Sequence, residues 1–118
     1  MLDTKALQGA TIAGTVLQLA MVVAGHFVAF VKMNVFAFGG MAISLAAGFL
    51  YGRRASSLGG AALGGALAGG VCALIGIAVS FALHDVPANI LVLGTASSAV
   101  TGAVGGAIGR LVSGTVSA

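Results

Sequence analysis

Residues 56–76 read SSLGGAALGGALAGGVCALIG, a run of small and apolar residues that contains no charge. Every fourth residue in it is small, in the row Gly60, Gly64, Ala68, Cys72 and Gly76. In water, each glycine would cost a helix about 1 kcal/mol relative to alanine. In lipid, a helix satisfies its backbone hydrogen bonds internally, and a row of small residues lets a second helix approach closely. We therefore expect a membrane-spanning helix with a packing face of small residues.

Lipid is also the solvent that suits the composition of the whole chain. The 118 residues are 59% hydrophobic and 6% charged, against about 25% charged in soluble domains. The charges leave four uncharged runs of 26, 20, 30 and 24 residues. Each run exceeds the roughly 18 apolar residues that a spanning helix needs. We predict one all-α integral membrane domain, 1–118, a four-helix bundle with spans at about 6–31, 34–52, 57–83 and 88–109.

The breaks between the runs carry helix start and stop signals. Asn34 suits the N-cap of the second span, and the serines at 56 and 57 suit that of the third. The segment His84–Pro87 separates the third span from the fourth. In it, Asp85 suits an N-cap, and Pro87 lies where the first helical turn needs no N–H.

The basic residues predict the orientation of the bundle. Four spans place both termini and the turn after residue 52 on one side, with Lys5, Arg53, Arg54 and Arg110, and leave only Lys32 on the other side. The positive-inside rule then predicts a bacterial inner membrane protein with both termini in the cytoplasm.

The two halves of the chain are similar, which predicts an internal duplication. A shift of 51 residues aligns identical residues of the first and third spans, beginning with Gly9 on Gly60. A shift of 57 residues does the same for the second and fourth spans and ends with Arg53 on Arg110. Two such helical hairpins would be parallel repeats related by an axis along the membrane normal.

Rows of small residues also mark the second and fourth spans. The second span carries Gly40, Ser44 and Gly48, and the fourth carries Gly102 and Gly106. We predict that all these rows are helix-packing interfaces, within the chain or between copies. The third span is small on several sides, which predicts a central position. Its Cys72 is the only cysteine, so an internal disulfide is excluded and the thiol serves as a small apolar filler.

His26 and Gln18 form the candidate ligand or polar site. His26 is the one titratable side chain well inside a predicted span, which makes it a candidate functional residue. It could ligate a tetrapyrrole such as haem or a pigment, or contact a quinone, or simply make a hydrogen bond near the interface. Gln18 is expected to make an interhelical hydrogen bond, with a polar solute path as the alternative. Tyr51, beside Arg53, is the one aromatic residue with the polar tip of an interfacial belt.

The motifs that are missing narrow the function. No predicted span contains Asp, Glu, Lys or Arg, and the sequence has no metal-ligand cluster, activated nucleophile or phosphate loop, which argues against an enzyme and against proton-coupled transport. The isolated cations argue against a nucleic acid partner. We expect an accessory or structural subunit of a membrane complex, with lipids and other membrane subunits or copies of itself as partners. The alternatives are a homo-oligomeric small channel or holin-like pore, and a pigment, haem or quinone bundle that uses His26.

Overall fold

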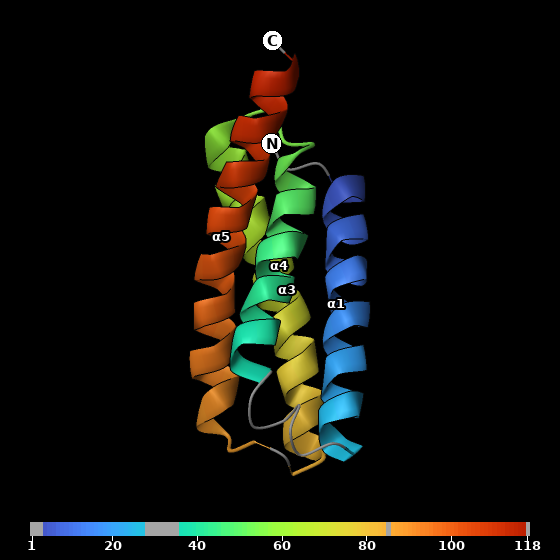
Figure 1. Ribbon diagram of the computed structural model, residues 1–118. Helices are drawn as coiled ribbons and strands as arrows, with labels where there is room; N and C mark the ends of the chain where they lie inside the picture. Colours follow the sequence, from blue (N-terminus) through green and yellow to red (C-terminus); the bar gives the residue numbers. More distant parts are fainter. Residues whose placement is uncertain (1–3, 28–35, 85, 118) are drawn as a thin grey trace.

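The computed structural model describes residues 4–27, 36–84 and 86–117, which form an all-α four-helix bundle (Figure 1). Its helices are α1 (Thr4–Phe27), α3 (Phe36–Gly52), α4 (Leu58–Ala82) and α5 (Asn89–Ser117). They run along one long axis in a body of 46 × 21 × 20 Å. The 29 residues of α5 account for this length, because a helix rises about 1.5 Å per residue. The predicted all-α four-helix bundle is confirmed.

Three of these helices are long and apolar enough to cross a membrane: Thr4–Phe27, Leu58–Ala82 and Asn89–Ser113. A shorter apolar helix, Gly39–Gly52, is part of α3. With 17 residues, α3 is about 26 Å long, somewhat less than a bilayer core of about 30 Å. The predicted start of this span at Asn34 lies outside the described residues. The three long helices indicate an integral membrane protein.

Helix α4 begins and ends close to its predicted limits. Ser57 has an extended backbone (φ −141°, ψ 158°), and its Oγ accepts a hydrogen bond from the N–H of Gly60 at 3.1 Å, so the predicted serine cap is confirmed. The helix stops after Ala82, and His84 enters the left-handed region (φ 63°) that commonly ends helices. The predicted cap Asp85 lies outside the described residues.

Helix α5 is longer than the sequence predicted. The fourth span is predicted to end near residue 109, but the helix continues to Ser117. Arg110 ends the uncharged run but not the helix, because a charged side chain does not break the helical backbone hydrogen bonds. Ser113 Oγ then donates to the carbonyl oxygen of Arg53 at 2.9 Å, which holds the extension against the end of α3.

Helices α3 and α4 occupy the centre of the bundle. They pack against each other and both contact α1 and α5, whereas α1 and α5 make no contact within the described ranges. Figure 1 shows α1 and α5 on opposite sides of the central pair. A two-fold relation between the hairpins would pair the α3–α4 contact with an equivalent α1–α5 contact. The duplication therefore stays a prediction from the sequence.

One end of the bundle collects the cations of the described residues. The first turn of α1, the turn between α3 and α4, and the last turns of α5 lie at the same end (Figure 1). We call it the basic end, defined by Lys5, Arg53, Arg54 and Arg110. The first turn of α1 and the last turns of α5 share this end of the bundle, in agreement with the predicted placement of both termini on one side.

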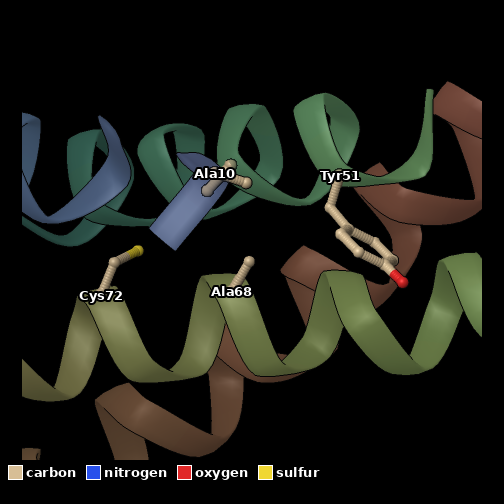
Figure 2. Packing of buried hydrophobic residues seen from close by; sticks show 5 residues of the cluster. Ala10, Tyr51, Ala68 and Cys72 are labelled. Carbon is tan, nitrogen blue, oxygen red and sulfur yellow. The ribbon is translucent and has the colours of Figure 1, made fainter. Parts of the chain in front are cut away.

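The core consists of small side chains and one large ring, in the cluster Ala10, Ala47, Tyr51, Ala68 and Cys72. Tyr51 is 0% exposed, so the expectation of an interfacial belt residue is wrong. Figure 2 shows its ring reaching from α3 toward α4. There it lies against Gly64, where an added Cβ would be 2.5 Å from Tyr51 Cζ. The absence of a side chain at Gly64 is what makes room for the ring.

Large apolar side chains cover the outside of the bundle. Val16 of α1, Leu63 of α4 and Val100 of α5 are each more than half exposed. Apolar surface of this extent is rare on soluble monomers. It matches a lipid environment, as the three long apolar helices do.

Candidate functional site

The small residues of α5 meet the backbones of both central helices. A Cβ added at Gly48 of α3 or at Gly65 of α4 would collide with the carbonyl oxygen of Gly102 of α5. One turn further along α5, a Cβ at Gly52 would collide with the carbonyl oxygen of Gly106. Backbone atoms cannot rotate away as a side chain can, so a side chain at Gly48 or Gly65 would require the helices to move apart. We call the meeting of Gly48, Gly65 and Gly102 the three-helix junction.

The predicted row of α4 faces α1 and α3. Cys72 lies where Gly14 of α1 leaves space, since a Cβ at Gly14 would be 2.9 Å from the thiol sulfur. One turn later, a Cβ at Gly76 would be 2.9 Å from the Cβ of Gln18. Ala68 is fully buried in the core cluster. Helix α4 thus presents one small face to α1 and α3 and another to α5.

Two of the residues predicted to form helix-packing interfaces, Gly60 and Gly40, are packed less tightly than the others. A Cβ at Gly60 would meet only Ser57 Oγ, at 3.0 Å, so this glycine belongs to the capped start of α4 and not to a helix interface. A Cβ at Gly40 would lie 3.7 Å from Gln18 Oε1 and from Met21 Cε, which is ordinary van der Waals contact.

A buried polar cluster, formed by Gln18, Ser44 and Cys72, joins three helices. The amide nitrogen of Gln18 donates to the carbonyl oxygen of Gly40 at 3.2 Å and to Ser44 Oγ at 3.4 Å, and it lies 4.0 Å from Cys72 Sγ. Ser44 Oγ and Cys72 Sγ both donate to the carbonyl oxygen of Gly69, at 3.2 and 3.3 Å. The three side chains are at most 2% exposed.

The hydrogen bonds of this cluster have a structural role. An amide, a hydroxyl and a thiol in mutual contact hold helices together, and interhelical hydrogen bonds of this kind contribute about 0.6–2 kcal/mol in membranes. The interhelical bond expected of Gln18 is therefore present, between α1 and α3. Because its amide is bonded to a neighbouring helix, this arrangement favours the bond over a solute path.

His26 lies apart from the buried polar cluster. It is an exposed residue in the last turn of α1, and its ring packs edge-to-face on Phe27 with centroids 5.0 Å apart. Gln18 is buried about 12 Å earlier along the same helix, so the structure does not bring the two candidate residues together. Within 4–27, 36–84 and 86–117, no three His, Cys, Asp or Glu side chains gather into a metal site.

Several contact residues escaped the sequence reasoning. Gly65 and Gly69 of α4 contact α5, and Gly14 of α1 accommodates Cys72, but none of them was singled out as an interface. A signal was available, because Ala61, Gly65, Gly69 and Ala73 form a second row of small residues at four-residue spacing. For Tyr51, nothing in the sequence pairs the ring with Gly64.

Comparisons of the chain with models of protein families, with curated proteins and with solved structures find no match. Function is therefore inferred from the residues themselves. The two features that bear on it are the three-helix junction and the buried polar cluster.

Proposed function

We propose that the chain is a small non-catalytic integral membrane protein that acts by helix packing, as an accessory or structural subunit of a larger membrane complex. Its partners are membrane lipids and other membrane subunits. The observation that carries the proposal is that polar side chains lie inside the bundle and apolar ones outside. Gln18 and Ser44 are buried and bond one helix of the chain to another, while large apolar side chains cover the outside.

The same observation favours a subunit over a homo-oligomeric pore. A water-filled pore between copies needs polar or small residues on the outer face of each copy. Here the glycines of the three-helix junction contact helices of the same chain, and Val16 and Val100 are typical of the outer face. Such a surface suits lipid chains and the apolar faces of other membrane proteins.

Native mass spectrometry combined with a leakage assay tests the proposal. From native membranes in a mild detergent, we expect the 11.3-kDa chain in an assembly with polypeptides of other masses. Purified and reconstituted alone into vesicles loaded with a small dye, it should release dye no faster than vesicles without protein. If the 11.3-kDa chain instead forms multimers of itself that release dye, the proposal of an accessory subunit would be wrong and a pore would be the better assignment.

We further propose that both termini face the cytoplasm of a bacterial inner membrane, with the basic end on that side. The positive-inside rule supports this orientation, because Lys5, Arg53, Arg54 and Arg110 share that end. A reporter fused after Ala118 should be active only as a cytoplasmic reporter. Activity of a periplasmic reporter at the same position would show that the proposed orientation is wrong and that the C-terminus faces the periplasm.

A further inference from the structure

A cavity of about 590 Å³ opens at the basic end of the bundle. Cations, a hydroxyl and apolar groups line it, among them Lys5, Arg53, Arg54, Ser113, Ala6 and Leu50. These residues come from α1, from the end of α3 and the turn that follows it, and from the extension of α5. The volume is within the range of about 300–1,000 Å³ typical of small-molecule sites.

The charge at this end is strongly one-sided. The described residues contain four Lys and Arg side chains, all at the basic end, and no Asp or Glu. The two acids of the chain, Asp3 and Asp85, lie outside the described ranges. The charge of the described residues at this end is therefore positive.

Hydrogen bonds fix the backbone of the turn that carries the two arginines of the cavity. The N–H of Arg53 donates to the carbonyl oxygen of Phe49 at 3.0 Å, and that of Arg54 to the carbonyl oxygen of Tyr51 at 2.9 Å. Ser113 Oγ of α5 donates to the carbonyl oxygen of Arg53 at 2.9 Å. Three backbone-anchored hydrogen bonds thus hold the two residues at the mouth of the cavity.

We propose that this cavity binds the phosphate group of an anionic lipid, in the leaflet that the basic end faces. Guanidinium groups recognise phosphate through paired N–H···O bonds, and an ammonium group adds a compact charge. Basic pockets between membrane helices are known to hold anionic headgroups. Leu50 is 43% exposed beside the cations, so a lipid in the cavity also contacts apolar surface. A soluble phosphate compound has the same headgroup chemistry but leaves that surface unused.

Gly9 allows the cavity to be filled without disturbing the helix packing. It lines the cavity, and a Cβ added to it would meet no atom within 4 Å. Gly9→Leu therefore places a side chain in the cavity while α1 keeps its contacts. Gly59→Leu is the matched control, because a Cβ at Gly59 also meets nothing within 4 Å and Gly59 is not among the lining residues.

The test titrates the full chain, purified in detergent and freed of lipid, with phosphatidylglycerol, phosphatidylcholine or inorganic phosphate, and counts bound molecules by native mass spectrometry. We expect phosphatidylglycerol to bind more tightly than phosphatidylcholine to the wild type and to Gly59→Leu. Gly9→Leu should lose this preference. Arg53→Gln and Arg54→Gln should each weaken phosphatidylglycerol binding about fivefold.

The variants and ligands of this experiment distinguish a lipid site in the cavity from a diffuse charged surface and from a site for a soluble phosphate compound. Gly9→Leu with an undiminished preference for phosphatidylglycerol would overturn the cavity as the site, since the charge would then act as a diffuse surface. Equal binding of both lipids by the wild type would overturn it as well. Displacement of phosphatidylglycerol by millimolar inorganic phosphate would overturn the lipid as ligand and assign the site to a soluble phosphate compound. Tyr51 fluorescence identifies any variant that has unfolded.

Discussion

Replacing Gly102 by alanine perturbs the three-helix junction with a single methyl group. The added Cβ would collide with the carbonyl oxygen of Gly65 and lie 3.0 Å from the Cα of Gly69, and both atoms belong to the backbone of α4. Ordinary van der Waals contact begins at 3.4 Å. Because neither neighbour can rotate away, α4 and α5 must separate by about 0.5–1 Å, which is enough to weaken dispersion contacts along their crossing.

The size of the effect follows from those contacts. A gap of about 0.5–1 Å removes about a quarter to a half of each dispersion contact of about 0.1–0.2 kcal/mol, and a close helix crossing has several tens of them. The free energy of unfolding should therefore fall by about 1–4 kcal/mol, comparable to the cost of overpacking a core. Gly9→Ala is the control, since nothing lies within 4 Å of its added Cβ. It should be neutral or stabilising by up to about 1 kcal/mol.

Tyr51 provides the assay. The chain has one tyrosine and no tryptophan, and this ring is 0% exposed against Gly64. Unfolding by sodium dodecyl sulfate in mixed micelles, followed by Tyr51 fluorescence, gives a midpoint for the wild type, Gly102→Ala and Gly9→Ala. Equal midpoints for the two variants would mean that α4 and α5 separate at no cost. The claim that close approach at the three-helix junction stabilises the bundle would then be refuted.

Gln18→Met removes the amide at similar volume and should cost about 1–2 kcal/mol in the same titration, because the bonds to Gly40 and Ser44 are lost; an unchanged midpoint would make the buried polar cluster dispensable. His84→Gly relieves the left-handed backbone at φ 63° and should raise the free energy of unfolding by up to about 1 kcal/mol. A free energy of unfolding below that of the wild type would show that the imidazole side chain stabilises the fold. His26→Gln should keep expression and assembly with a loss of about 1 kcal/mol or less, because His26 is exposed. A coloured wild-type protein that loses its visible absorbance in this variant would instead identify a tetrapyrrole ligand.

The fold could be predicted because its signals are local and strong. Each uncharged run is long enough for a helix to cross a bilayer core of about 30 Å, and a helix satisfies its backbone hydrogen bonds within the run. Ser57 lies where an N-cap is needed, and the segment at His84 ends α4. The end of α5 could not be placed in the same way, because a charged residue such as Arg110 ends an uncharged run without ending the helix.

The partners of each helix face could not be predicted, because α4 carries two rows with the same spacing. The row with Cys72 and Gly76 and the row with Gly65 and Gly69 are equally small, so periodicity does not tell which faces α1 and which faces α5. The choice depends on side chains far away in the sequence. Gln18 needs space beside Gly76, and this pairing depends on the three-dimensional arrangement.

Gly69 belongs both to the buried polar cluster and to the close contact with α5. On one side, its carbonyl oxygen accepts hydrogen bonds from Ser44 and Cys72 of the buried polar cluster. On the other, an added Cβ would lie 2.9 Å from the Cα of Gly102 and 2.9 Å from the carbonyl oxygen of Ser98, both in α5. Between helices in lipid, dispersion and hydrogen bonds replace the hydrophobic effect as the source of stability. A displacement of α4 at Gly69 weakens both, so the hydrogen bonds and the close packing of this bundle depend on the same backbone position.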